Sequence, residues 1–359
     1  MLIERRSNLL NHTKKIGCNA IAVFQPENVF YLTGFWGEGI AIFADNSAKL
    51  IAPKLEATRA LQISKECEII SSERGSSLIS TLVSEIKGKT TCSDCNDFAT
   101  IEYIQNKIGK KSFIINSEPF FHFRIIKDKY EIKTIANAAE IIDILFQVCT
   151  EEIKVGLSER ELQAKLIFEA MKMGATSPSY KSTLNPLIIA GGPNAAMPHS
   201  DISDRKFIKG DMIIVDLTLR YEGYIADATR TFALAPITSE EKKIYHIVRL
   251  SQQEGLDAIR DSSTCEQIDL ACRDVIKKEG YSEHFIHSTG HGIGLDVHEP
   301  PWLRMKNQEV VRTNMTVTIE PGIYLEDKTG VRIEDSVLVN KDKKASNFNK
   351  FTKDLIILD

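Results

Sequence analysis

Hydrophobic residues in the first third of the chain come in short runs separated by segments with a helical pattern. Residues 20–24 and 39–43 are apolar and are bounded by Gly, Pro and Asn, as buried strands are. Residues 49–52 and 67–70 continue this rhythm, and residues 55–64 and 77–86 have a helical pattern. This alternation predicts a small α/β unit in which helices cover a sheet.

The pattern changes after a charged stretch at residues 127–131. Apolar residues then recur at helical spacing from 132 to 152, at Ile135, Ala138, Ala139, Ile142, Leu145 and Phe146. Ser158, with Glu161 three residues later, is a typical start for a second helix. Residues 211–232 are rich in β-prone side chains, residues 240–260 and 266–279 are helical, and strands return afterwards. Strands and helices in blocks indicate an α+β domain, so we expect domains at residues 1–126 and 127–359.

Composition narrows the class of protein. A length of 359 residues suits two domains, and 43% hydrophobic with 26% charged residues is ordinary for a soluble globular protein. The net charge of −4 argues against nucleic acid as a partner. No apolar run approaches the ~18 residues of a spanning helix. The first residues lack the pattern of a signal peptide, so we expect no membrane association and a cytoplasmic location.

The seven cysteines are odd in number and scattered, which suits a reducing compartment better than a disulfide framework. Cys92 and Cys95 form a CxxC pair that could be half of a zinc site or a redox pair. No second pair lies at zinc-finger spacing, so a functional role is the less favoured alternative.

Two aspartates lie in a predicted hairpin between residues 211 and 232. If its turn is centred between Tyr221 and Glu222, Asp216 and Asp227 are cross-strand partners with Cβ atoms roughly 4.5–5.5 Å apart. Two bare carboxylates at that distance repel, and a bound cation resolves the conflict. The alternatives are that Asp227 pairs with Arg230 and that Asp216 simply ends a strand.

A glycine-rich segment follows at residues 287–301 and holds three of the eight histidines, His287, His291 and His298. The interleaved glycines permit tight turns and the close approach of a ligand, which favours a functional site. Further on, Glu320 and Glu334 stand beside β-branched residues, where an unpaired charge is expensive to bury. Alternatively, they are edge-strand acids in water near Arg332 or Arg312.

Four stretches together resemble one family: VDLTLRYEGYIADATRTF, HSTGHGIGLDVHEPP, TIEPGIY and GVRIEDSVLV, all between residues 215 and 339. They are similar to the prolidase, Xaa-Pro aminopeptidase and methionine aminopeptidase family. The start of the helix near Lys127 and the segment YLTGF at residues 31–35 extend the likeness to most of the chain. The resemblance implies a pita-bread α+β catalytic domain after a smaller creatinase-type α/β domain. One departure is Leu217-Thr218, where many members have a glycine.

The resemblance also implies a site with two divalent metal ions per chain. Asp216 would chelate one ion, His291 and Glu320 the other, and Asp227 and Glu334 would bridge them. Because the donor set is rich in oxygen, Mn²⁺ or Co²⁺ is favoured, with Zn²⁺ or Fe²⁺ as alternatives.

The remaining roles are also implied by the family. Glu320 would move a proton from water to the leaving nitrogen, His199 would contact the substrate near that nitrogen, and His298 would steady its carbonyl group. His287 would either orient metal ligands through hydrogen bonds or be a packed core residue. Arg332 would pair with a bridging carboxylate.

These implications lead to a peptidase that cleaves the bond before proline, most simply an Xaa-Pro dipeptidase acting on small peptides with proline second. An Xaa-Pro aminopeptidase acting on longer peptides is the alternative. A metal-free binding protein on the same fold is an alternative of a different class. The N-terminal domain argues against a methionine aminopeptidase. A dipeptidase needs a cation for the free carboxylate, and Arg304 is a candidate. The family likeness suggests a homodimer.

Overall fold

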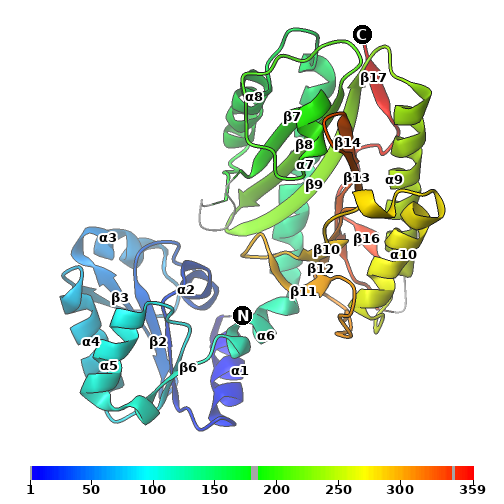
Figure 1. Cartoon of the computed structure of the whole chain (residues 1–359). Coiled ribbons are helices and arrows are strands. Elements are labelled where there is room, and N and C mark those ends of the chain that lie inside the picture. Colours follow the sequence, from blue (N-terminus) through cyan, green and yellow to red (C-terminus); the bar gives the residue numbers. More distant parts are fainter. Residues whose placement is uncertain (1, 179–184, 342–343) are drawn as a thin grey trace. The chain divides into compact units, whose positions relative to one another are not determined.

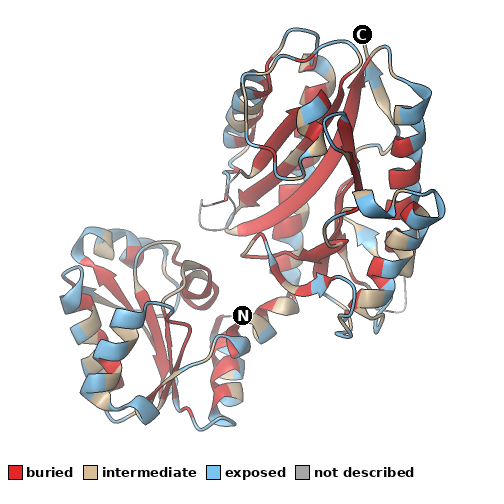
Figure 2. Cartoon of the chain, in the orientation of Figure 1, coloured by how far each residue is buried: buried red, intermediate tan, exposed pale blue. Residues whose placement is uncertain are grey.

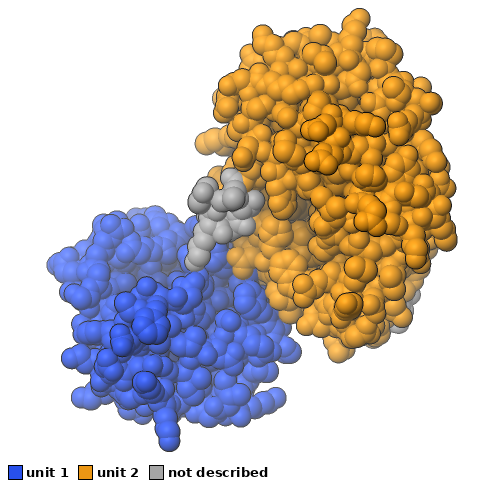
Figure 3. Space-filling view, in the orientation of Figure 1, with its two compact units in different colours: residues 1–124 blue, residues 125–359 orange. Residues whose placement is uncertain are grey.

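The computed structural model describes residues 2–178, 185–341 and 344–359 (Figure 1). The chain forms two compact units, residues 1–124 and 125–359, which Figure 3 shows in different colours. No helix in the described ranges is both long and apolar enough to cross a lipid bilayer.

The first unit is built on one six-stranded sheet with the strand order β4-β3-β2-β1-β5-β6. Its strands are β1 (Ala20–Val23), β2 (Ile40–Ala44), β3 (Ser47–Pro53), β4 (Glu68–Ser72), β5 (Thr91–Ser93) and β6 (Phe113–Ile115). Its helices are α1 (Leu2–Lys14), α2 (Pro26–Thr33), α3 (Lys54–Ile63), α4 (Ser76–Ile86), α5 (Phe98–Ile108) and α6 (Glu118–Ile125). The four expected strands and two expected helices correspond to β1–β4, α3 and α4. The small α/β unit is therefore confirmed.

The second unit begins with a helix pair packed on an antiparallel sheet. Helices α7 (Lys129–Glu152) and α8 (Glu159–Lys172) cover β7 (Leu187–Gly191), β8 (Met212–Tyr221) and β9 (Tyr224–Leu234), and β17 (Ile356–Leu358) extends this sheet in the order β17-β9-β8-β7. The six apolar positions expected on the first helix are all buried, and all but Ile135 belong to the core between helix and sheet. Figure 2 shows that β8 and β9 are buried along nearly their whole length.

A second layer of similar build completes this unit. Helices α9 (Ser239–Ala258) and α10 (Cys265–Lys278) share a core with a sheet of order β11-β10-β12-β15-β16 and a separate hairpin β13-β14. These strands are β10 (Gly290–Gly292), β11 (Glu299–Leu303), β12 (Thr316–Ile319), β13 (Gly322–Leu325), β14 (Thr329–Arg332), β15 (Asp335–Leu338) and β16 (Ser346–Asn347). Helices and antiparallel strands in separate blocks confirm the α+β class.

The α-helices α7, α8, α9 and α10 each begin with a complete capping box. In each box the first side chain accepts a hydrogen bond from the backbone N–H three residues later, and the side chain at that later position bonds back. The pairs are Asp128–Glu131, Ser158–Glu161, Thr238–Glu241 and Thr264–Gln267. The predicted helix start at Ser158 is confirmed.

The β8–β9 hairpin differs from the expected register. Its turn is Glu222-Gly223, with φ of 46° and 92°, so both turn residues adopt the left-handed conformation of a tight two-residue turn. Asp216 therefore lies opposite Thr229, and Asp227 lies opposite Thr218. The predicted Asp216–Asp227 pairing is wrong because the turn centre lies one residue further along. The shift moves each partner by two positions, so both carboxylates still project from the same face.

Candidate metal centre and active site

One cavity of about 190 Å³ in the second unit collects the predicted site residues. Nine side chains to which the sequence assigned a role line this cavity: His199, Asp216, Asp227, His287, His291, His298, Glu320, Arg332 and Glu334. They come from segments spread over 135 positions of the chain, so only the folded sheets can bring them together.

The hairpin β8–β9 supplies Asp216, Thr218 and Asp227 to the lining of the cavity. Thr218 Oγ1 donates to Asp227 Oδ1 at 2.8 Å. Asp216 lies in the middle of β8 and Arg230 pairs with Asp335, so both structural alternatives for these aspartates are wrong. Alternation along the two strands places Thr218 and Thr229 on the carboxylate face, a signal that was available in the sequence but not used.

The two glutamates come from the other sheet. Glu320 directly follows β12 and opens onto the cavity, and Glu334 lies between β14 and β15 with only 2% of its surface exposed. Thr229 Oγ1 donates to Glu334 Oε2 at 2.7 Å, and the Arg230 guanidinium donates to the Glu334 carbonyl at 2.6 Å. Both glutamates line the cavity, so the alternative of edge-strand acids in water is wrong.

His291 lies on β10 with its ring turned towards the carboxylates. Its Nδ1 is 3.0 Å from the carbonyl of Gly292, so a proton on Nδ1 leaves the lone pair of Nε2 free. Nε2 lies 3.4 Å from Glu320 Oε1. Burial, and then the neighbouring His298, lower the pKa of His291 to about 3, which keeps the ring neutral as a metal ligand must be.

The ligand atoms converge most tightly at Asp227, His291 and Glu334, which each offer one atom within 4.8 Å of the others. Two buried oxygens at the site, Asp216 Oδ1 and Glu334 Oε1, have no hydrogen-bond partner among the residues that the structure describes. A buried acceptor without a partner is costly, and a cation would satisfy both oxygens. The donor set therefore fits divalent metal ions.

The electrostatics of the carboxylates agree with this fit. Burial first, and then the charges of Asp216 and Glu320, raise the pKa of Asp227 well above its usual range. Burial, followed by Asp227 and Glu320, does the same to the pKa of Glu334. Burial also raises the pKa of Glu320 to about 8. Without cations the cluster must hold protons, and a divalent ion would allow its carboxyl groups to ionise together.

Arg332 connects one ligand to a buried network. Nη2 donates to Asp216 Oδ2 at 2.6 Å, Nε donates to Thr229 Oγ1 at 3.1 Å, and Nη1 donates to Tyr324 Oη at 2.8 Å. The ion pair is with Asp216, which corrects the expected pairing with a bridging carboxylate. Tyr324 Oη also lies 2.9 Å from His287 Nε2, so His287 contacts this network. Burial and then Arg332 lower the pKa of His287 to about 3.

Aromatic rings form another part of the cavity lining. The ring centroids of His298 and His291 are 4.4 Å apart. Trp302 stacks on His298 with a distance of 6.3 Å between ring centroids and an angle of 16° between ring planes. Desolvation, and then the nearby His199, lower the pKa of His298, which favours the neutral ring. Trp302 is 36% exposed and is the Cα partner of His291 across β10 and β11. Sequence reasoning singled out neither Trp302 nor Tyr324, because each looked like an ordinary strand residue.

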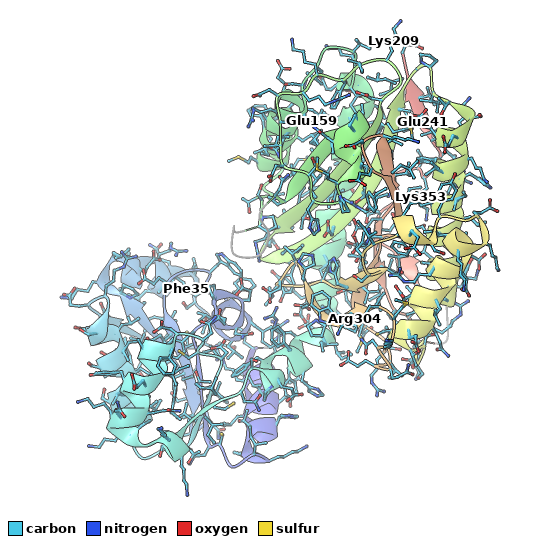
Figure 4. All side chains as sticks on the ribbon, viewed as in Figure 1. Phe35, Glu159, Lys209, Glu241, Arg304 and Lys353 are labelled. Atoms are coloured by element: carbon cyan, nitrogen blue, oxygen red, sulfur yellow. The ribbon has the colours of Figure 1, made fainter. Side chains whose placement is uncertain are left out.

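Other candidates from the sequence lie elsewhere. Arg304 follows β11, is exposed, and is not among the lining residues of the cavity (Figure 4). Cys92 and Cys95 are free, buried thiols of the first unit. Burial, and then Cys18, raise the pKa of Cys92 to about 12, so this thiol stays protonated rather than forming the thiolate that binds metal.

Two family models match the chain. The model of the creatinase/prolidase N-terminal domain matches residues 5–126, and that of metallopeptidase family M24 matches residues 133–341. The chain belongs to metallopeptidase family M24. It is therefore a peptidase of the hydrolase class, and membership implies divalent metal ions at the site built above.

Relatives of this family match along the whole chain. An Xaa-Pro dipeptidase of Pyrococcus furiosus is 32% identical over 98% of this chain and 99% of its own. The solved structure of an Xaa-Pro dipeptidase from Bacillus anthracis has a TM-score of 0.92 at 32% identity, and covers 100% of both chains. An X-Pro aminopeptidase structure from Thermotoga maritima has a TM-score of 0.85 at 29% identity, covering 97% of this chain and 100% of its own. The expected family and fold are confirmed.

Proposed function

We propose that this metallopeptidase hydrolyses the peptide bond before proline, as an Xaa-Pro dipeptidase. The observation that carries the proposal is the convergence of the nine site residues on one cavity in which Asp216 Oδ1 and Glu334 Oε1 lack partners. Full-length similarity to the dipeptidases of Pyrococcus furiosus and Bacillus anthracis supports the specificity for Xaa-Pro. The cavity of about 190 Å³ lies below the ~300–1,000 Å³ of pockets for larger ligands, which favours a short peptide.

We propose Asp216, Asp227, His291, Glu320 and Glu334 as ligands of two metal ions. Four carboxylates and one imidazole form a hard donor set that favours Mn²⁺ or Co²⁺. When bound, such ions lower the pKa of a water molecule and polarise the scissile carbonyl group.

The side chains of the chain divide the remaining work. Glu320, which lines the cavity, would accept a proton from the attacking water and deliver it to the leaving nitrogen. His298 and His199 also line the cavity, and we assign them hydrogen bonds donated to the substrate. Arg332 holds Asp216 in a fixed orientation through their 2.6 Å hydrogen bond.

The test compares Ala-Pro with Ala-Pro-Ala and Ala-Ala. Purified protein is stripped of metal with a chelator, reloaded with Mn²⁺, Co²⁺ or Zn²⁺, and assayed for released alanine. We expect the highest kcat/KM for Ala-Pro in the Mn²⁺ or Co²⁺ form and little cleavage of Ala-Ala. Asp227→Asn is expected to be inactive, and the surface variant Glu326→Gln serves as the matched control. Cleavage of Ala-Ala as fast as Ala-Pro would contradict the specificity for proline.

A second candidate is an Xaa-Pro aminopeptidase acting on longer peptides. Arg332 is the one Arg or Lys among the described lining residues, and Asp216 already engages it. A dipeptidase must also bind the free carboxylate of proline, and an aminopeptidase need not. A strong preference for Ala-Pro-Ala would favour this candidate. If the protein binds no metal and no metal restores cleavage, a binding protein is the remaining function.

We also propose that the chain is a homodimer in the cytoplasm. The seven free cysteines are compatible with a reducing compartment. The family likeness supports the dimer. Light scattering of the metal-loaded protein tests it, since a dimer has twice the chain mass of 40.3 kDa.

A further inference from the structure

A buried ion pair between Lys127 and Glu299 lies against residues 293–298, the segment that ends at His298. Lys127 Nζ is 2.6 Å from Glu299 Oε1, and each side chain is only 1% exposed. Burying two charges costs desolvation energy that their attraction roughly repays, so such a pair contributes little net stability. Its geometry, in contrast, fixes two distant segments of the chain against each other.

Both partners stand on fixed backbone. The Lys127 N–H donates to the carbonyl of Asn314 at 2.9 Å, and the next residue, Asp128, is the N-cap of α7. Glu299 is the first residue of β11 and lies opposite Gly292, directly beside His291. The ion pair therefore joins the start of α7 to the strand that follows His298.

The backbone between the two site histidines passes close over this pair. A Cβ atom added to Gly294 would lie 2.6 Å from Glu299 Oε1 and 3.1 Å from Lys127 Cε, so only glycine fits. The Ile225 N–H of β9 donates to the Gly294 carbonyl at 2.8 Å. The segment is thus held between the ion pair and the hairpin that carries Asp216 and Asp227.

We infer that Lys127 and Glu299 are positioning residues for His298. The pair holds residues 293–298 in a fixed position relative to the metal ligands. It thereby determines where the His298 imidazole contacts the substrate. A displacement of about 1 Å at such a group can lower a rate by roughly 10²-fold. The inference rests on the proposed function, because the rate concerned is that of Xaa-Pro hydrolysis.

The test separates positioning from mere stability. Lys127→Met leaves a buried carboxylate and is expected to lower the melting temperature. The double variant Lys127→Met/Glu299→Leu replaces both charges with apolar side chains of similar size and is expected to recover it. We expect kcat for Ala-Pro to stay at least about tenfold below the parent value in this double variant, with KM and metal content little changed. A kcat within twofold of the parent would overturn the inference.

Two further variants sharpen the result. Glu299→Gln keeps the shape and an oxygen for Lys127 Nζ, so we expect it to retain most of kcat; a loss as large as that of the double variant would contradict a role in geometry. Arg205→Met breaks another ion pair of the same unit, 2.7 Å from Asp211, whose residues do not line the cavity. It should lower the melting temperature and leave kcat unchanged.

A spectroscopic measurement does not depend on activity. The imidazole NMR signal of His298 is assigned in metal-free protein by its loss in His298→Gln. We expect it to shift or broaden in the double variant and to stay in place in Arg205→Met. An unshifted signal would overturn the inference. If the parent protein cleaves no Xaa-Pro peptide, the proposed function fails while this comparison still tests the positioning.

Discussion

Metal binding to the cavity should release protons, and their number follows from the carboxyl groups. Glu320 has a pKa raised to about 8 by its burial, and Asp227 and Glu334 also have raised pKa values. A carboxyl group must lose its proton before it can bind a metal ion. Loading the metal-free protein at neutral pH is the perturbation.

Glu320 alone sets a lower limit on the release. With a pKa of about 8, it carries about 0.9 proton at pH 7 and about 0.1 at pH 9. Removing that proton at pH 7 costs about 1.4 kcal/mol, which weakens the apparent metal affinity about tenfold relative to alkaline pH. Asp227 and Glu334 add to the number of protons released and to the free-energy cost of releasing them. We therefore expect metal binding to release more than one proton per chain at pH 7.

Calorimetry measures this number directly. Mn²⁺ is titrated into chelator-treated protein in buffers of different ionisation enthalpy, and the slope of the observed heat against that enthalpy gives the protons released. We expect the slope to fall between pH 7 and pH 9 as the apparent affinity rises. Glu320→Gln should lower the release at pH 7 by about one proton, and the exposed control Glu326→Gln should leave it unchanged.

A release below about 0.3 proton at pH 7 would refute the reasoning. Such a result would mean that the carboxylates are already ionised in the metal-free protein. Hydrogen bonds from Thr218, Thr229 and Arg332 would then outweigh burial and mutual repulsion, and the demand for a cation would lose its electrostatic basis.

Three other expectations concern the same cavity. Arg332→Lys keeps the charge but loses the fork that bonds Asp216, Thr229 and Tyr324, so kcat/KM should fall about 10–100-fold; activity within twofold of the parent would contradict this. Trp302→Ala should leave the melting temperature nearly unchanged, since the ring is partly exposed, and should raise KM for Leu-Pro more than for Gly-Pro; an equal effect on both peptides would argue against an apolar contact. The metal-free protein should lose stability in urea unfolding as pH rises from about 7 to 8, because Glu320 stays protonated in the folded protein up to a pKa of about 8 but is ionised when unfolded. In this window His287 and His291, whose lowered pKa values act in the opposite direction at lower pH, are largely neutral in both states. A flat pH profile would contradict this last expectation.

The sequence predicted the residues of the candidate metal site better than it predicted the neighbouring side chains that hold them in place. Asp216 and Asp227 were placed on one face from an assumed hairpin register, and that conclusion survived a wrong register because the error in pairing was an even number of residues. A pairing register wrong by one residue would instead have put the two carboxylates on opposite faces of the hairpin. The strand pattern alone did not assign Glu320 and Glu334 to the site, and their prediction as site residues depended on the family resemblance.

Long-range contacts explain what the sequence did not reveal. Glu334 is buried because Thr229 and Arg230, more than a hundred residues earlier, bond to it. Lys127 was noted only as part of a charged stretch, and its partner Glu299 lies 172 positions away. Neither contact leaves a local pattern, since periodicity reports which face of an element is buried and not which distant group meets it.

The four capping boxes of the second unit have a consequence for the order of folding. Each box needs only four neighbouring residues, so α7, α8, α9 and α10 carry their own start signals and can nucleate before the sheets pair. The proposed metal ligands, in contrast, meet only after strands from both layers have paired. We therefore expect bound metal to lower the unfolding rate far more than it raises the refolding rate. The ions would then lengthen the lifetime of the folded protein without directing its formation.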